Sequence, residues 1–461
     1  MSHECSQKRQ LQRVSQRLLA NGGDAMIHLG DITKIKGDNI PQVDVITFGS
    51  PCQDLSIAGK RAGLSGERSG LFIEAVRIIK EMREATNGEY PKYAVWENVP
   101  GAFSSNKGED FRAVLEELAR IKEAGISIPG PDKSKWAKAG LITGDDWSIA
   151  WRTMDAQYWG VPQRRLRISL VLDFTGGRAG EILFEPESLR GHFAPGITPG
   201  QATAGAVGNG AGTADCTDAI PVNLQIATRH KSLGERTGLG VGHAGDAAYT
   251  LQEGHEHGVC CPDIAKAYTL KIRSGCEGGG KGALVQTEKS ATDYTVITLH
   301  GETVVGADLY NGTLTGDKAV TLTAAAAKGG TNTGPSVIEK IIRWIVRRLT
   351  PTECERLQGY PDGWTDLGSW IDSKGKTHKD ADTPRYKALG NSIALPQWYY
   401  VLGGIADRLP DNATLGSLFD GIGGFPYVWA QLHAGRKELC VWASEIEEFP
   451  IAVTKKWFPS E

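Results

Sequence analysis

The sequence predicts an α/β protein in which helices cover both faces of a parallel β-sheet, together with a smaller, loop-rich β domain. Two observations lead to this expectation. Short apolar runs alternate with stretches of helical periodicity on both flanks of the chain, and 29 of the 58 glycines lie in residues 176–340. Alternating strands and helices are typical of a parallel sheet, and β-prone runs between glycine clusters are typical of small strands joined by loops.

The predicted strands of the sheet are short, and polar residues follow them. They cover residues 26–29, 43–48, 93–96, 167–172, 415–419 and 439–443. Apolar residues at helical spacing predict helices over residues 71–79, 111–121, 425–433 and 451–457. Ligands of open α/β sheets bind at the carboxyl ends of the strands. The polar residues after each strand are therefore the candidates for a functional site.

Composition excludes several classes of protein. The 461 residues are 40% hydrophobic and 23% charged with a net charge of −3, which excludes wholesale disorder. No run reaches the ~18–20 apolar residues of a membrane-spanning helix, and the first residues lack the basic and apolar regions of a secretion signal. The eight cysteines form no CxxC pair. This predicts free thiols, no metal site and a cytoplasmic protein without a membrane partner.

Four segments are expected along the chain. Residues 1–25 form an appended amphipathic helix, residues 26–175 and 384–461 form the two parts of the α/β domain, and residues 176–383 form the loop-rich β domain. A flexible low-complexity insert is the alternative for the middle of the chain. There, a phrase recurs as Ala-Tyr-Thr-Leu at 248–251 and 267–270 and as Ala-Val-Thr-Leu at 319–322.

The C-terminal flank carries the pattern of an adenosine-type site. A predicted strand runs into Asp420-Gly421-Ile422-Gly423-Gly424, and the next strand ends at Glu445. Glycines let the backbone approach a ligand closely, and an acidic residue about 20 positions later suits a ribose hydroxyl pair. Only two strands remain here, so the N-terminal strands must complete the sheet. We expect the strand at 439–443 beside residues 27–29, residues 459 and 26 within about 15 Å, and Asp31 beside Glu445.

Four further residues carry reactive chemistry at predicted strand ends. Cys52 lies in Gly-Ser-Pro-Cys-Gln after one strand, and Glu97 follows the next. A nucleophilic thiol needs a partner that manages the protons of its substrate, and Glu97 suits that role. Arg165 and Arg167 are expected on one face of a third strand, where they could bind phosphate or stabilise a ring that gains negative charge.

These motifs together resemble the DNA cytosine-5 methyltransferases. The resemblance rests on residues 49–53, 97–99, 163–167, 348–361, 390–392 and 419–423, and it covers roughly residues 26–175 and 345–459. It implies a Rossmann-like methyltransferase domain that uses S-adenosylmethionine, and a target-recognition domain in the middle of the chain. The glycine-rich cofactor loop opens most family members but stands near the C-terminus here, so the order of motifs looks circularly permuted.

The resemblance also implies a mechanism and a set of site residues. The Cys52 thiolate adds to carbon-6 of a cytosine flipped out of double-stranded DNA, Glu97 protonates or hydrogen-bonds ring nitrogen-3, and carbon-5 takes the methyl group. Arg165 would support the flipped base, with Arg167 as the second candidate. The implied cofactor contacts are Phe419, Asp420, Gly421, Gly423, Glu445, Ile446, Asp31, Ile32, Pro51, Leu71, Asn391 and Ser392.

The expected role is methylation of a specific DNA sequence by a monomeric enzyme, in protection of bacterial or phage DNA from restriction. Alternatives are an RNA cytosine-5 methyltransferase, a non-catalytic DNA-binding relative and a nicotinamide oxidoreductase. The presence of both Cys52 and Glu97 disfavours the second, and the third has no use for them. The repeated phrases are either tandem recognition elements for several DNA sequences or repeated hairpins in one module.

Overall fold

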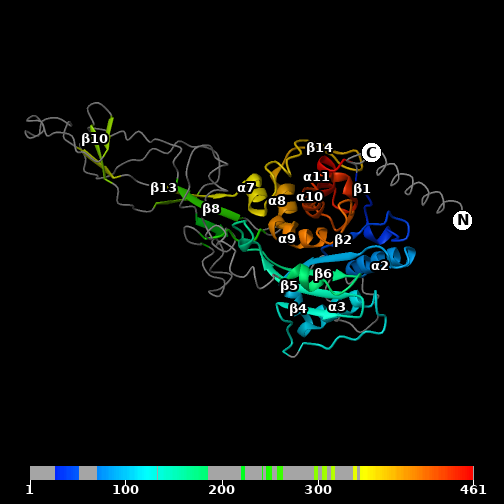
Figure 1. Cartoon of the computed structure of the whole chain (residues 1–461). Helices are drawn as coiled ribbons and strands as arrows, with labels where there is room; N and C mark the ends of the chain where they lie inside the picture. The colour runs from blue at the N-terminus through cyan, green and yellow to red at the C-terminus, as the bar shows by residue number, and fades with distance from the viewer. Residues whose placement is uncertain are drawn as a thin grey trace, which may run out of the picture. The chain divides into compact units, whose positions relative to one another are not determined.

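The computed structural model describes residues 26–50, 70–131, 133–184, 220–223, 241, 246–251, 257–262, 295–298, 304–308, 313–316, 336–339 and 343–459 (Figure 1). The chain divides into two compact units. Unit 1 comprises Met1–Thr203, Ala247–His255 and Thr350–Glu461, and unit 2 comprises Ala204–Asp246 and Glu256–Leu349. The predicted appended helix at 1–25 lies outside the described residues. Unit 2 contains fewer residues than the segment 176–383, which the sequence analysis assigned to the recognition domain.

The described part of unit 1 contains an eight-stranded sheet in the order β1-β17-β16-β2-β3-β6-β5-β4. The strands, in this order, are Ile27–His28, Cys440–Ser444, Leu415–Leu418, Val45–Phe48, Tyr93–Asn98, Leu166–Asp173, Ser148–Asp155 and Ala139–Thr143. The first five are parallel to one another. Their carboxyl ends therefore meet at one edge of the sheet, where a ligand site is expected.

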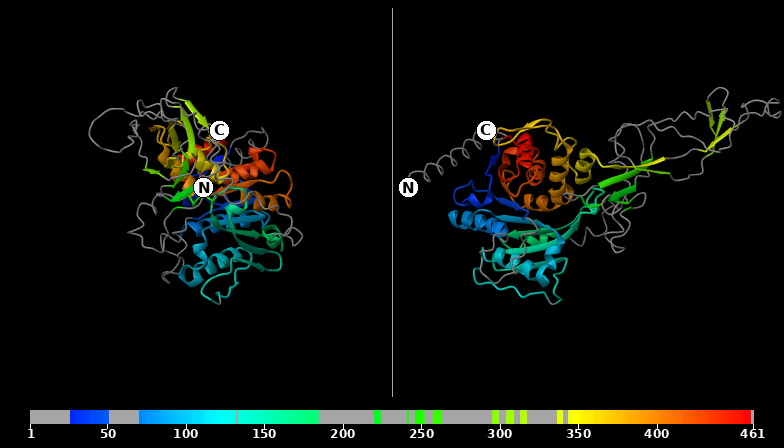
Figure 2. Two further views of the ribbon diagram at one scale, coloured as in Figure 1. Left: turned by 90° about the vertical axis from the view of Figure 1, so that its left-hand side faces the viewer. Right: turned by 180° about the vertical axis from the view of Figure 1, so that it is seen from behind.

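Helices cover both faces of this sheet (Figures 1 and 2). On one face lie α2 (Gly70–Ala85) and α3 (Glu109–Ala119); on the other lie α9 (Leu395–Ala406), α10 (Gly424–Leu432) and α11 (Glu448–Trp457). The helix α2 buries Phe72, Ala75, Ile79 and Met82, whose spacing puts them on one side of a helix. The remaining helices are α4 (Ala179–Leu183), α7 (Pro351–Gln358) and α8 (Asp382–Asn391).

The two ends of the described chain lie side by side. In the sheet, Ile27 pairs with Trp442 and His28 with Ala443, and the amide of Met26 donates to the carbonyl of Pro459 at 3.1 Å. The prediction that both termini complete one sheet is confirmed. The predicted helices at 71–79, 111–121, 425–433 and 451–457 are also confirmed, as α2, α3, α10 and α11.

The expected parallel sheet is present in the first five strands, and three further strands extend it with the opposite pairing. The strands β6, β5 and β4 run antiparallel to their neighbours. Only residues 156–165 join β5 to β6, and a parallel pair needs a crossover of a dozen or more residues. The strand β6 begins at Leu166, so Arg165 lies before the strand and does not share its face with Arg167.

The described part of unit 2 consists of short antiparallel strands. One sheet has the order β7-β8-β13-β9, formed by Ile220–Asn223, His257–Pro262, Arg343–Arg348 and Thr295–Thr298. The other has the order β11-β10-β12, formed by Thr313–Gly316, Val304–Asp308 and Ser336–Glu339. Over the residues that the structure describes, every helix is too short or too polar to cross a membrane.

Candidate active site

The glycine-rich turn after β16, residues 419–424, contains three residues with left-handed backbone conformation. The φ angles of Phe419, Gly421 and Gly423 are 56°, 59° and 78°. A bulky residue at positive φ is an outlier of the kind that gathers at functional sites. A side chain at Gly424, where α10 begins, would collide with Tyr360, because an added Cβ would lie 2.5 Å from the tyrosine oxygen. The turn therefore depends on these residue types.

Glu445 stands beside this turn at the end of β17. Its Oε2 accepts the amide N–H of Gly421 at 2.9 Å, and its Oε1 accepts those of Ile446 at 2.7 Å and Glu447 at 2.9 Å. These bonds fix the carboxylate in one orientation. The side chain of Ile446 is 67% exposed, so it offers an apolar surface next to the carboxylate.

Asp31 follows β1, the neighbour of β17. The Ser444 hydroxyl donates to the Gly30 carbonyl at 2.7 Å, so the residues that precede Glu445 and Asp31 are bonded to each other. Asp31 accepts the hydroxyl and amide of Thr33, and these bonds lower the pKa of its carboxyl below the usual value. Both carboxylates thus lie at one edge of the sheet, as the sequence predicts.

This set of groups fits the adenosine part of S-adenosylmethionine. An oriented carboxylate suits two ribose hydroxyls, an exposed apolar side chain suits the face of an adenine, and an ionised carboxylate accepts from an amino group. Ile32 does not line such a pocket by its side chain, because it is only 4% exposed and belongs to the core. Leu71 packs partly buried against the same core, and Pro51 lies outside the described residues.

The side chain of Asp420 lies beneath the turn. Its Oδ2 accepts the hydroxyl of Thr454 on α11 at 3.3 Å, and the residue is 6% exposed. Burial, and secondarily the charge of Glu445, raise the pKa of Asp420 to about 7. Asp420 therefore contacts the scaffold of the turn through its side chain.

Glu97 and Arg167 form an ion pair at the adjoining part of the sheet. The Arg167 Nε lies 3.0 Å from the Glu97 Oε1, and the two side chains are only 14% and 15% exposed. Glu97 is near the end of β3, and Arg167 lies on the antiparallel neighbour β6. The guanidinium fixes the direction of the carboxylate.

The chain that leads to Cys52 passes close to the Glu97 carboxylate. An added Cβ at Gly49 would lie 3.2 Å from the Glu97 Oε2, so glycine permits the close approach. The next residue, Ser50, is held in place because its carbonyl accepts from Asn98 at 3.0 Å and its hydroxyl accepts from the Trp96 indole at 3.2 Å. Cys52 lies two positions further on, outside the described residues.

Arg165 has a different environment from Arg167. It is 1% exposed and donates to the carbonyls of Leu251 at 3.0 Å, Gly390 at 3.2 Å and Ser392. Burial and the nearby charge of Arg167 lower its pKa to about 9. Arg165 thus joins three segments of the chain in the interior, and it bonds backbone carbonyls where we expected contact with a base.

Ser392 connects Arg165 to the glycine-rich turn through residues to which the sequence analysis gave no role. The Ser392 hydroxyl lies 2.5 Å from the Tyr360 oxygen, and the Trp364 indole donates to the carbonyl of Ile422 at 2.9 Å. The available signal was the motif at 348–361, which begins α7 with a capping box between Thr350 and Glu353. Asn391, the last residue of α8, is exposed.

Two other groups bear on the assignment. Two of the cysteines, Cys354 and Cys440, are free and buried, and burial raises the pKa of both thiols, so neither of these two competes with Cys52 as a nucleophile. The described residues include no cluster of three or more metal-ligating side chains.

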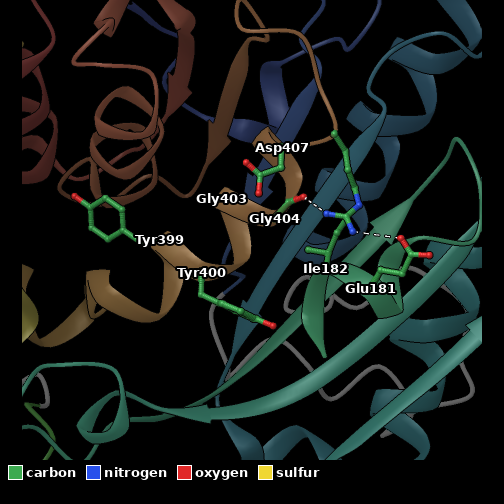
Figure 3. Close-up of a pocket in the computed structure, with 8 residues that line it drawn as sticks. Glu181, Ile182, Tyr399, Tyr400, Gly403, Gly404 and Asp407 are labelled. Atoms are coloured by element: carbon green, nitrogen blue, oxygen red, sulfur yellow. Dashed lines mark hydrogen bonds and ion pairs between the residues drawn. The ribbon is translucent and has the colours of Figure 1, made fainter. Parts of the chain in front are cut away.

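A separate cavity of about 340 Å³ contains none of the predicted site residues (Figure 3). Its lining is Glu181, Ile182, Tyr399, Tyr400, Gly403, Gly404, Asp407 and Arg408.

The geometry of the site fits a methyltransferase that uses S-adenosylmethionine, and comparison with known proteins agrees with this class. Residues 14–128 match the family of C-5 cytosine-specific DNA methylases. A type II methyltransferase of Bacillus subtilis, M.BsuFI, is 35% identical over 142 residues, which cover 31% of this chain and 27% of the relative. M.AquIA of Picosynechococcus is 31% identical over 183 residues, which cover 38% and 62%. A protein of Escherichia phage P1 named DNA N-6-adenine-methyltransferase is 30% identical over 455 residues, which cover 85% and 56%.

Residues 14–128 thus resemble the C-5 cytosine-specific DNA methylases, and type II DNA methyltransferases are among the relatives of the chain. S-adenosylmethionine is the methyl donor of this family, and the groups around Glu445 fit it. The chain spans between about a quarter and two thirds of the length of these relatives.

Proposed function

We propose that this chain methylates carbon-5 of cytosine in a specific double-stranded DNA sequence, with Cys52 as the nucleophile. The observation that carries the proposal is the Glu97–Arg167 pair, which lies against the backbone that leads into Gly-Ser-Pro-Cys. Carbon-5 of cytosine is too weak a nucleophile to take a methyl group unaided. A thiolate and a placed carboxylate are what the ring needs to become reactive.

Each residue then has a defined task. The thiolate of Cys52 forms a bond to carbon-6, and the electron pair of the 5,6 double bond moves toward carbon-5. Glu97 protonates or hydrogen-bonds ring nitrogen-3, which compensates the charge that develops on the ring. Bound S-adenosylmethionine supplies an electrophilic methyl group. Loss of the carbon-5 proton and release of the thiolate restore the aromatic ring and the free enzyme.

The geometry favours Arg167 over Arg165 as the cation that acts on the base. Arg167 contacts the Glu97 carboxylate directly, so it can orient this group and share a contact with the ring. Arg165 donates three hydrogen bonds from its guanidinium to backbone carbonyls, which leaves at most two of its five N–H groups for a base. We therefore reverse the order expected from the resemblance and give Arg165 a positioning role.

Adenine N-6 methylation is the second candidate, because the phage P1 relative carries that name over a match that covers 85% of this chain. The relative is longer, and this chain covers 56% of it, so the named activity need not reside in the shared part. An exocyclic amine also needs no thiol at a ring carbon. The Glu97–Arg167 pair, and the presence of Cys52 two residues after Ser50 in the sequence, favour cytosine.

The deciding experiment identifies the methylated base. DNA from cells that express the chain is sequenced after bisulfite conversion, and its nucleosides are separated by mass spectrometry. We expect 5-methylcytosine in one or a few sequences. N-6-methyladenine without 5-methylcytosine would reject the proposal. Protection of that DNA from cleavage at the methylated sequences would test the proposed role in bacteria or phage, and gel filtration would test the proposed monomer.

A further inference from the structure

Four exposed lysines gather on two adjoining segments of unit 1. Lys107 lies in the loop after β3, and Lys133, Lys135 and Lys138 lie in the segment that leads into β4. The sequence has no acidic residue from 133 to 144. The chain as a whole has a net charge of −3, so a polyanion must be held by a local basic surface of this kind.

The ammonium groups of these lysines are available to a ligand. Among the residues that the structure describes, none of the four has a carboxylate within 4.0 Å. A carboxylate does lie near the start of the second segment, since an added Cβ at Gly130 would lie 3.3 Å from the Glu109 Oε1. Glu109 is paired with Arg112 at 2.8 Å, so its charge is already compensated.

Tertiary contacts fix the backbone that carries the lysines. The amide of Trp136 donates to the Phe103 carbonyl at 3.1 Å, and its indole donates to the Gly108 carbonyl at 2.8 Å. The Lys138 carbonyl accepts from the amide of Thr153 on β5 at 2.7 Å. The two segments are therefore held against each other and against the sheet, which reduces the entropy lost when a ligand binds.

The register of the sheet places this surface beside the Glu97–Arg167 pair. Glu97 on β3 lies opposite Ser169 on β6, and Ser169 lies opposite Arg152 on β5. Arg152 in turn lies opposite Ala139, the first residue of β4, which is the outer strand of the sheet (Figure 1). Three strand spacings of ~4.8 Å therefore separate Glu97 from Ala139, about 14 Å along one row.

The turn between β5 and β6 reaches the same edge of the sheet. It carries the exposed Arg164 and Tyr158, whose side chain is 73% exposed. Arginine, lysine and tyrosine side chains all bind the phosphates of DNA. The exposed groups of this edge thus continue from the ion pair to the four lysines.

We propose that Lys107, Lys133, Lys135 and Lys138 form a surface that binds phosphates of the DNA duplex beside the target base. A DNA strand rises 3.4 Å per base, so about 14 Å corresponds to roughly four nucleotides from the flipped cytosine. The α/β domain itself would thus hold one flank of the target, in addition to any contact from the recognition region. This distance from the cytosine rests on the proposed function, whereas duplex binding by the surface does not.

Binding of a fluorescent duplex of random sequence tests the surface without reference to activity. Anisotropy is measured over a range of salt concentrations, because each phosphate contact contributes about 0.9 to the slope of log K against log salt. Lys133→Gln/Lys135→Gln/Lys138→Gln should lose up to about 2.7 of this slope and bind about ten-fold or more weakly near 0.1 M salt. The same three changes to arginine keep the charge and should keep the slope.

A second triple variant controls for net charge. Lys80→Gln/Lys437→Gln/Lys455→Gln makes the same charge change away from this edge, since Lys437 precedes β17 and the other two lie in the later turns of α2 and α11. It should leave the slope unchanged. Equal losses in both triple variants would show that net charge alone acts, and would overturn the surface. A slope that changes for double-stranded RNA but not for DNA would assign the surface to RNA and overturn the proposal as well.

Methylation kinetics test the place of the surface on the duplex. With a long duplex, Lys133→Gln/Lys135→Gln/Lys138→Gln should raise KM for DNA by about ten-fold or more and leave kcat and S-adenosylmethionine affinity within about two-fold. Trimming the duplex to fewer than about four base pairs beyond the target cytosine on one of its two sides should abolish the difference in KM, because the contacted phosphates are then missing. A difference that persists with either side trimmed would overturn the assigned location. Absence of cytosine methylation by the parent protein would reject the proposed function and leave the duplex-binding result to stand or fall separately.

Discussion

The two sides of the proposed site hold their carboxylates in different ways. On the cofactor side, Glu445 accepts three backbone N–H groups and lies beside the exposed Ile446. On the side proposed for the cytosine base, Glu97 is paired with Arg167, and both side chains are nearly buried. The first arrangement arises within one strand–turn–helix–strand unit. The second needs two antiparallel strands and the turn at Gly49. Local backbone thus places Glu445, the proposed ribose ligand, and tertiary packing places Glu97, the proposed proton donor.

The largest effect is expected on the base side, from Cys52→Ser. A serine hydroxyl is a far weaker nucleophile than a thiolate at neutral pH, so methyl transfer should fall below detection. Covalent trapping on DNA that contains 5-fluorocytosine should vanish as well, because it requires the bond to carbon-6. Calorimetry should show S-adenosylmethionine binding within about two-fold of the parent. Near-normal turnover would remove Cys52 from its proposed role.

A smaller loss is expected from the ion pair. Glu97→Gln keeps the shape of the side chain but removes its proton chemistry, and should lower kcat by about 10²–10⁴-fold. Arg167→Gln should give a similar loss. Because the two groups act as a unit, the double variant should lose much less than the product of the single losses. Fully multiplicative losses would show that the pair does not act together.

Replacing the proposed recognition region should affect the choice of DNA sequence and leave cofactor binding unchanged. Exchange of residues 256–349 for the corresponding segment of a relative should alter or abolish the methylated sequence. It should leave the affinity for S-adenosylmethionine within about two-fold, because the proposed cofactor contacts lie in unit 1. Loss of cofactor affinity in a folded exchange variant, checked by circular dichroism, would contradict this division of labour.

On the cofactor side, Glu445→Gln should weaken S-adenosylmethionine binding by about ten- to a hundred-fold, the range for a hydrogen bond to a charged group. The amide also has only one acceptor oxygen for the three N–H groups that Glu445 now binds. Lys387→Gln is a matched control, because Lys387 pairs with Glu447 on the exposed surface. An unchanged dissociation constant in Glu445→Gln would disconnect Glu445 from the ribose.

The same contrast explains what the sequence could predict. Gly421, Gly423 and Glu445 belong to one local pattern, and the structure places them together at the expected edge. The completion of the sheet by both termini followed from counting strands. The separation of Arg165 from Arg167 was not predictable, because it depends on where β6 begins and on which carbonyls reach its start from residues 251, 390 and 392.

The smallest effect concerns Asp420, beneath the cofactor turn. Its carboxyl has a pKa of about 7 in the folded chain and near 3.8 when unfolded, so between these values the folded state holds the proton more tightly. The free energy of unfolding must then fall as the pH rises from about 4 to about 7, and stay level above that range. Asp420→Asn keeps an acceptor for the Thr454 hydroxyl and carries no charge. The variant should match the parent near pH 4 and exceed its Tm by several degrees at pH 8, as measured by calorimetry. Asp366→Asn, on the surface, should show no such difference. A Tm gap that is independent of pH would mean that Asp420 is already ionised in the interior, and that the turn is held by charge.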